Sequence, residues 1–260
     1  PKFEGEARKL YDDAQKMIAR IVEEGSITAN GVCGIFPANT TQNDIVEIYA
    51  DDSRTKLLAA LPTLRQQQAK KEVPYYLSLC DYVAPKESGV ADYIGAFAVT
   101  AGVGVEKIVA EFDAMDDDYS SILVKVLADR LAEAFAEYLH LLVRKEYWAY
   151  ASDESLDLEG LLKIEYQGIR PAPGYPPCPD HRDKEVIWKL LDPERNCGIG
   201  LTESRMMTPG ASVSGFYYTH PKSKYFGVGK LGKDQVEDYA DRVDCSVSEA
   251  EKWLASVLGY

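Results

Sequence analysis

Between residues 168 and 181 the chain reads GIRPAPGYPPCPDH, and five of these fourteen residues are proline. Proline fixes its own φ, carries no N–H group and pushes the preceding residue towards extended backbone. This segment, the proline loop, therefore cannot form a helix or a central strand, and a stiff, extended loop is predicted. A loop already stiffened by proline loses less conformational entropy on binding than a flexible one. We expect it to hold Arg170, Tyr175 and His181 in fixed positions around a small polar ligand.

Bulk composition restricts the class of protein. The chain has 260 residues, enough for one large domain or two small ones. Its net charge of −13 would repel a phosphate backbone, so no nucleic-acid partner is expected. No apolar run approaches the roughly 20 residues of a membrane helix, and the N-terminus lacks the apolar core of a signal peptide, so no membrane association is expected. The chain starts with proline rather than methionine, which suggests a piece excised from a longer protein.

Cysteine and histidine usage indicates a reducing compartment and no metal. The five cysteines are scattered and form no C-x-x-C motif, so neither a disulfide framework nor a zinc ribbon is indicated. This pattern predicts a cytoplasmic location. Because the chain has only three histidines, a dedicated histidine metal site is not expected.

Apolar periodicity and turn residues predict the order of helices and strands. We expect helices over residues 6–22, 105–115, 116–144, 156–164 and 183–191, and two more in the C-terminal tail, the last capped by Ser246 with Glu249. Strands are expected over residues 31–36, 45–49, 56–61 and 91–100, and a further pair over 212–218 and 224–228. Pro37 should end the first strand, and Thr63 should cap a polar helix after the third. Strands and helices do not alternate regularly, which favours a single α+β domain.

Arg170 is the strongest candidate for a ligand-binding side chain. Its planar guanidinium matches a carboxylate in bidentate fashion, although an internal salt bridge remains the alternative. The carbonyl oxygens of the neighbouring residues 171–173 are suited to accept from an amine. Gly174 permits close backbone approach or a positive φ. Tyr175 is placed to stack on a flat group, unless it simply packs against the protein.

Two other segments carry candidate residues. Tyr225 and Phe226 are adjacent on the expected strand, so one should enter the core and the other can meet a ligand. Core and edge packing is the alternative for this pair. Asp129 and Glu133 lie four residues apart on the long helix, where they form either a solvated face or a site that holds an ammonium group.

The common cofactor and nucleophile motifs are absent or incomplete. Gly102 and Gly104 follow a strand and precede a helix, which imitates a dinucleotide fingerprint, but Lys107 stands where the third glycine belongs. The sequence contains no G-x-S-x-G, H-E-x-x-H or phosphate-binding loop. The usual hydrolase, kinase and nucleotide-binding classes therefore have no support.

The proline loop closely resembles the S-adenosylmethionine-binding loop of cobalamin-dependent methionine synthase. The segments ADYIGAFAVTAG, VKVLADRLAEAFAEYLH, LTES…PGASVSG, SKYF and KDQVEDYA resemble the same C-terminal activation domain in the same order. The matches run from near Arg8 to Tyr260, so the resemblance implies one activation domain over residues 1–260. It also implies an α+β fold: a single C-shaped domain with a central antiparallel sheet flanked by helices.

The resemblance further implies a function. Activation domains of this family bind S-adenosylmethionine and present its methyl group to cobalamin on a neighbouring domain of the same polypeptide. After the cofactor is oxidised, this methyl group and an electron from flavodoxin or a diflavin reductase restore methylcobalamin. The isolated domain is expected to carry no catalytic residue and to turn nothing over alone.

The family's site residues carry over to definite positions here. The implied S-adenosylmethionine residues are Glu133, Arg170, Ala172, Gly174, Tyr175, Tyr225 and Phe226. Asp129 and His181 are implied at the face towards the cobalamin domain. A further acidic ligand residue of the family lies upstream of the region that aligns here, so the site is expected to bind more weakly than in a complete domain.

Two other functions stay open on the sequence. The chain can be a docking module for flavodoxin or the cobalamin domain with a degraded ligand site. It can also be a self-sufficient methyltransferase with a small-molecule acceptor, although the missing G-x-G-x-x-G loop speaks against the common form of such enzymes.

Overall fold

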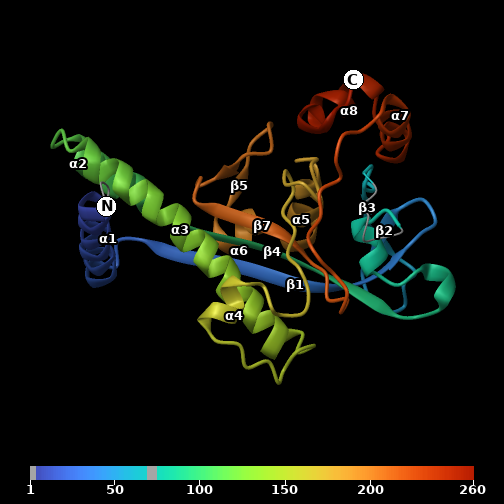
Figure 1. Ribbon diagram of the computed structural model, residues 1–260, viewed down its shortest axis with the longest axis horizontal. Helices are drawn as coiled ribbons and strands as arrows, with labels where there is room; N and C mark the ends of the chain where they lie inside the picture. The colour runs from blue at the N-terminus through green and yellow to red at the C-terminus, as the bar shows by residue number, and fades with distance from the viewer. Residues whose placement is uncertain (1–3, 69–74) are drawn as a thin grey trace. The chain divides into compact units, whose positions relative to one another are not determined.

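A five-stranded sheet forms the framework of the computed structural model, which describes residues 4–68 and 75–260 (Figure 1). The strand order is β3-β2-β1-β4-β7. The strands are β1 (Thr28–Thr40), β2 (Ile45–Tyr49), β3 (Leu57–Pro62), β4 (Asp92–Val103) and β7 (Ser212–Tyr217). Antiparallel register places Ala38 opposite Ile48 and Val46 opposite Leu61. Figure 1 shows β1 and β4 side by side as the two long strands.

Helices occupy the chain between and after the strands. They are α1 (Glu4–Glu24), α2 (Val105–Asp113), α3 (Asp118–Leu142), α4 (Leu158–Leu162), α5 (Asp183–Leu191), α6 (Pro193–Cys197), α7 (Lys233–Arg242) and α8 (Val247–Trp253). A π-helical turn, Val143–Tyr147, follows α3, and a two-stranded ribbon pairs β5 (Gly200–Leu201) with β6 (Met207–Thr208). Short 3-10 turns span Leu79–Tyr82, Lys86–Ser88 and Ala255–Val257. The predicted α+β class with a central antiparallel sheet is confirmed.

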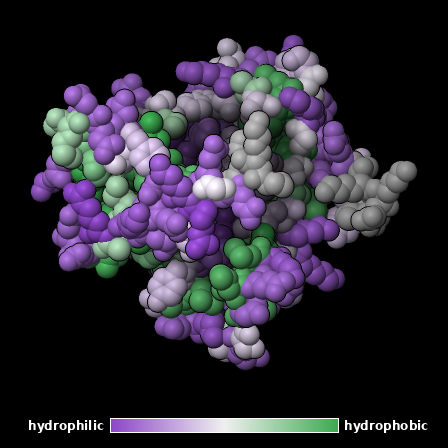
Figure 2. Space-filling view, turned by 60° about the vertical axis from the view of Figure 1, so that its left-hand side comes forward, coloured by the Kyte–Doolittle hydropathy of each residue, from purple (hydrophilic) through white to green (hydrophobic). Residues whose placement is uncertain are grey.

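The surface is mainly polar. Figure 2 shows a largely hydrophilic face on which hydrophobic side chains gather in separate patches. Of the helices in the described residues, none is both long and apolar enough to span a bilayer.

The chain divides into two compact units. The first comprises Pro1–Val32, Ala98–Leu139 and Pro193–Val213, and the second comprises Cys33–Phe97, His140–Asp192 and Ser214–Tyr260. In the first unit, Ile108 and Phe112 of α2 pack with Val124 of α3. Small residues allow α3 to approach the end of β4 closely, because Ala128 and Ala132 meet Ala101 there. The second unit carries the proline loop.

Three local expectations were wrong, each for a reason of packing. β1 continues through Pro37 to Thr40. Pairing with β2 begins at Ala38, so the missing N–H of Pro37 costs no hydrogen bond in that ladder. Thr63 caps no helix in the described residues that follow it up to residue 68; its hydroxyl contacts Ser78 Oγ at 2.7 Å and donates to Asp44 O at 3.0 Å. The rest of the expected polar helix lies outside the described residues.

The expected strand over residues 224–228 is the third error. Its place beside β7 is taken by the proline loop, because Ile169 and Tyr218 exchange backbone hydrogen bonds of 2.9 and 3.0 Å and the Phe216 N–H donates to Pro171 O. Segment 224–228 lies instead along the far part of the loop, where the Val228 N–H donates to Pro176 O at 3.0 Å.

Candidate functional site

The first part of the proline loop is an extended edge segment. Residues 169–171 pair with the end of β7 through the hydrogen bonds described above. Pro171 and Pro173 are buried, whereas Arg170 and Ala172 between them are partly exposed. This alternation fits an edge position, where a proline that lacks an N–H breaks no ladder. The predicted extended backbone is confirmed for residues 169–171.

The second part of the loop curls into two turns. The Tyr175 N–H donates to Ala172 O at 3.2 Å, and the Cys178 N–H donates to Tyr175 O at 2.9 Å. The Gly174 N–H closes the structure by donating to Cys178 O at 2.7 Å. The carbonyl oxygens of Pro171 and Ala172, which we expected to accept from a ligand, therefore already accept one backbone N–H each and keep one lone pair.

Gly174 lies at the point where the loop reverses. Its φ is +97°, and a Cβ atom added there would lie 2.1 Å from His181 Cε1. Positive φ favours glycine, and the close approach of the imidazole excludes any side chain. Glycine is therefore required at this position for two independent reasons.

Replacing Gly174 with alanine is expected to lower the free energy of unfolding by about 2 kcal/mol, because strained backbone and a displaced ring add together. Urea denaturation measures this. Gly210→Ala is the matched control, since a Cβ atom added at Gly210 would meet nothing within 4 Å and its φ is not positive. Equal losses of stability in the two variants would contradict the conclusion that position 174 requires glycine.

The side chain of Arg170 is held from two sides. Its Nη1 donates to the Tyr166 hydroxyl at 2.6 Å and contacts His140 Nδ1 at 3.3 Å. An arginine N–H can only donate, so Nδ1 must accept, and His140 carries its proton on Nε2 towards the Tyr150 hydroxyl at 3.2 Å. Burial first, then the charges of Arg144 and Arg170, lower the pKa of His140 well below its ordinary value. His140 is therefore a neutral acceptor.

Stacked aromatic rings hold the His140 ring, which accepts from Arg170, in place. The His140 ring stacks on Tyr217 at 4.9 Å, and Tyr217 stacks on Phe97 at 4.7 Å. Tyr166 meets the His140 ring edge-on at 5.2 Å. The fully buried guanidinium of Arg144 lies 3.9 Å from the centre of the Tyr166 ring, on its face. Arg170 thus rests on groups that cannot easily move.

Tyr225 connects the loop to segment 224–228. Its hydroxyl accepts from the Arg170 backbone N–H at 3.0 Å, and its side chain is 40% exposed, whereas Phe226 is 6% exposed. One aromatic residue therefore faces outward and the other enters the core, as expected, although the segment is not a strand. Tyr175 is also exposed.

An open groove lies along residues 174–176 of the loop; Arg170 and Tyr225 are not among the residues that line it. Its volume is about 450 Å³, which is within the usual range of small-molecule sites. Gly174, Tyr175 and Pro176 form one side, and residues 227–230 form another. The groove and the exposed Tyr175 lie on the same turn of the loop.

The exit of the loop is anchored to the C-terminal helices. The Arg182 side chain donates to the buried Asp180 carboxylate at 2.7 to 3.2 Å, and the Tyr239 hydroxyl of α7 donates to it at 3.1 Å. The Arg182 guanidinium also lies 5.9 Å from the ring of Trp253 in α8. The C-terminal helices therefore help to hold the loop.

Asp183, the first residue of α5, lies buried beside this anchor. Cys178 Sγ donates to its Oδ2 at 3.0 Å. Burial first, and then the charge of Asp180, raise the pKa of Asp183 to about 8. At neutral pH Asp183 is therefore protonated in the folded chain.

Because its pKa is raised, Asp183 should make the stability of the folded chain depend on pH. Between its ordinary value near 4 and the folded value of about 8, the folded chain keeps a proton that the unfolded chain releases. Its contribution to stability is complete below the unfolded pKa and is lost as the pH rises, at up to about 1.4 kcal/mol per unit. Urea denaturation at several pH values should show a shallower decline for Asp183→Asn than for the unmodified chain. The exposed Asp153→Asn serves as control and should keep the full slope.

Asp129 and Glu133 belong to the first unit. Both are exposed on α3, four residues apart. Their side chains therefore lie on one solvated face of the helix, available to an ammonium group or a partner. Their roles at the site stay a prediction.

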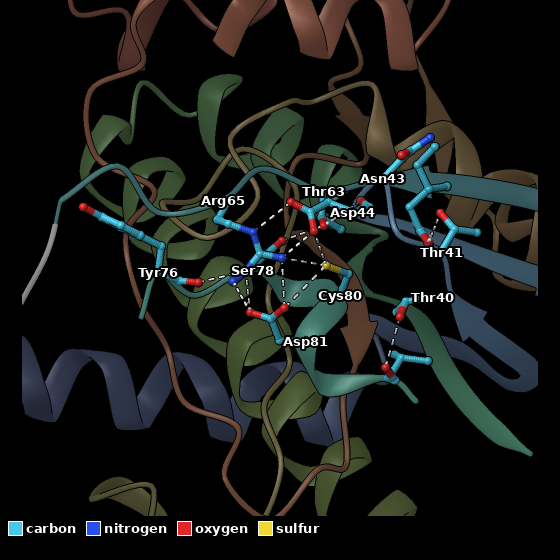
Figure 3. A network of polar contacts seen from close by, with 12 residues as sticks. Thr40, Thr41, Asn43, Asp44, Thr63, Arg65, Tyr76, Ser78, Cys80 and Asp81 are labelled. Carbon is cyan, nitrogen blue, oxygen red and sulfur yellow. Dashed lines mark hydrogen bonds and ion pairs between the residues drawn. The ribbon is translucent and has the colours of Figure 1, made fainter. Parts of the chain in front are cut away.

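A separate polar cluster lies in the second unit, where Asp44, Cys80 and Asp81 bring their ligand atoms within 4.8 Å of one another. Figure 3 shows Arg65 between the two carboxylates. Its guanidinium donates to Asp44 Oδ2 at 2.9 Å and to both Asp81 oxygens at 2.9 and 3.0 Å. Burial raises the pKa of Cys80 to about 11, so the thiol keeps its proton. The cluster is an arginine-centred network that ties the β1–β2 turn to the Leu79–Tyr82 turn.

Sequence reasoning missed several positioning residues. His140 and Tyr166 hold Arg170, and Lys184 contacts His181 at 2.7 Å. No motif connects these residues to the loop. His140 lies thirty positions before Arg170 in the chain. The contact of Lys184 with His181 is the one that the sequence could have suggested, because residues three positions apart at the start of a helix lie close together.

The structure defines an α+β domain that carries a proline-stiffened, arginine-bearing loop at the edge of its antiparallel sheet. The family described as "Vitamin B12 dependent methionine synthase, activation domain" matches residues 1–244. A solved structure, the MetH reactivation domain bound to AdoHcy, is 53% identical over 100% of this chain and 79% of that chain, with a TM-score of 0.95. The chain belongs to the vitamin B12 dependent methionine synthase activation domain family. Methionine synthase is a methyltransferase of methionine biosynthesis, so the predicted enzyme class is confirmed at the level of the family.

Proposed function

We propose that this chain binds S-adenosylmethionine at the proline loop and supports the reductive methylation of cob(II)alamin to methylcobalamin. The observation that carries this proposal is the rigid mounting of Arg170, whose side chain contacts Tyr166 and His140 and whose backbone N–H bonds Tyr225. The similar MetH reactivation domain was solved with AdoHcy, which differs from S-adenosylmethionine by the lost methyl group. A family member that holds the demethylated product supports the same ligand class here.

The residues of the loop match the parts of such a ligand. The Arg170 guanidinium pairs with the amino-acid carboxylate, and the second lone pair of Ala172 O accepts from the amino group or the adenosyl portion. Tyr225, whose ring is 40% exposed, lines the ligand, and an aromatic face near the sulfonium adds cation–π attraction, whereas Phe226 lies in the core behind it. Glu133 compensates positive charge. Gly174 and Tyr175 border a groove of about 450 Å³ that has room for the nucleoside.

The protein's own task in the reaction is positioning. A sulfonium methyl group is already activated, so no general base is required, and the loop needs only to keep the methyl carbon in line with the departing sulfur. Cobalamin held by the neighbouring domain would, after one-electron reduction, supply the nucleophile, while the residues of this chain would hold only the methyl donor. The C–S bond breaks and its electron pair stays on sulfur, which leaves S-adenosylhomocysteine in the loop.

The partners follow from this chemistry. The proposed partners are the cobalamin-binding domain of the same polypeptide and flavodoxin or a diflavin reductase, which supplies the electron. Asp129 of the first unit is exposed and His181 of the second unit is half-exposed. The five cysteines are free, which suits a reducing compartment such as the cytoplasm.

Titration calorimetry with S-adenosylmethionine tests the proposal. Saturable heat that S-adenosylhomocysteine displaces is the expected result. No binding at millimolar ligand would overturn the proposal and favour a docking module for flavodoxin or the cobalamin domain. Methyl transfer to a small acceptor without any corrinoid would instead support a self-sufficient methyltransferase.

A further inference from the structure

Lys184 is a buried lysine beside the proline loop. It stands in the first turn of α5, where its residue is 5% exposed, and its Nζ lies 2.7 Å from His181 Nδ1. Burial lowers the pKa of Lys184, and burial together with the charge of Lys184 lowers the pKa of His181. A lysine is rarely placed in the interior unless its ammonium group has a specific use.

The contact determines where His181 carries its proton. An ammonium group has three donors and no acceptor, so His181 Nδ1 must accept from Lys184. The proton of the neutral imidazole then resides on Nε2. In the described part of the chain Nε2 has no hydrogen-bond partner, so this N–H is free to donate to an incoming group.

Gly174 fixes the orientation of the same ring. A Cβ atom at Gly174 would lie 2.1 Å from Cε1 and 2.7 Å from each ring nitrogen, so the glycine backbone lies against the ring edge that ends in Cε1. The two nitrogens therefore flank the glycine, one towards Lys184 and the other away from it. The ring cannot flip without losing the Lys184 contact.

We propose that Lys184 is a positioning residue that holds His181 as the Nε2–H tautomer, so that the loop presents a neutral hydrogen-bond donor beside Gly174. The group it meets is a hydrogen-bond acceptor on the partner that covers the loop. This inference rests on the proposed function only for the identity of that partner, because the tautomer is a property of the chain alone.

Nitrogen-15 NMR of the chain labelled at histidine tests the proposal directly. Only three histidines are present, and His181→Asn assigns the signal. We expect a protonated Nε2 and an unprotonated Nδ1 for His181 in the unmodified chain at neutral pH. A proton on Nδ1 would overturn the proposal without any variant, whether or not S-adenosylmethionine binds.

Substitution at position 184 provides the second test. Lys184→Met should give a mixture of tautomers and raise the His181 titration midpoint, because the neighbouring positive charge is lost while Asp180 remains. Lys184→Arg keeps a donor and should restore the Nε2–H form. Lys189→Met, at an exposed lysine of the same helix, is the control and should change neither readout. Unchanged tautomer and midpoint in a folded Lys184→Met chain would also overturn the proposal. If Lys184→Met does not fold, the tautomer of His181 measured in the unmodified chain alone tests the proposal.

Discussion

Replacing Arg170 with alanine is expected to weaken S-adenosylmethionine binding by about 100-fold. Two charge-assisted hydrogen bonds to the ligand carboxylate are lost, and each contributes about 1.5–3 kcal/mol, reduced by the water that replaces them. Arg170→Lys keeps the charge but not the planar fork, so an intermediate affinity is expected. Titration calorimetry measures both variants.

The controls separate lost binding from lost folding. Arg170 also donates to Tyr166, so urea denaturation must accompany the calorimetry, and a stability loss of only about 1 kcal/mol is expected. Arg8→Ala removes an exposed arginine from α1 and should leave affinity unchanged. If Arg170→Ala folds and binds S-adenosylmethionine as tightly as the unmodified chain, the assigned ligand contact is wrong.

Replacing Glu154 with glutamine is expected to lower the free energy of unfolding by about 3–5 kcal/mol. Glu154 pairs in bidentate fashion with Arg144, through bonds of 2.7 and 2.9 Å, and the two side chains are 7% and 0% exposed. The substitution removes the bidentate carboxylate of Glu154 from the buried Arg144 charge. Because Arg144 also rests on the Tyr166 ring, Arg170 should lose its mounting in the same variant.

An exposed ion pair of the same unit provides the comparison. Lys163 and Glu159 are 59% and 73% exposed, so Glu159→Gln should change stability by less than about 0.5 kcal/mol. Urea denaturation of both variants measures the difference. A Glu154→Gln chain as stable as Glu159→Gln would show that the buried pair does not support the site.

Local sequence signals predicted the parts of the fold that depend on neighbouring residues. Helix α5 and strand β2 have the expected bounds, and Ser246 caps α8 by accepting from the Glu249 N–H. Gly198, with a φ of +74°, follows the last residue of α6. Caps, turns and periodicity act within a few residues, so they can be recognised without the rest of the chain.

The expected strand over residues 224–228 does not form, because a segment distant in the sequence occupies the same edge of the sheet. The proline loop pairs with the end of β7, and segment 224–228 bonds to the loop through Val228. Periodicity indicates that a segment suits extended backbone, but it does not indicate which of two such segments pairs with the edge strand of the sheet. The candidate residues Tyr225 and Phe226 nevertheless face outward and inward, as expected.

The sequence by itself determined that residues 168–181 form a loop bearing Arg170 and neither a helix nor a central strand, because proline restricts φ and lacks an N–H whatever surrounds it. It also determined the family, since several separate segments match in order. Only the tertiary structure decided that His140 and Tyr166 hold Arg170 and that Lys184 contacts His181 Nδ1. Such contacts depend on how the whole chain packs, and no local propensity encodes them.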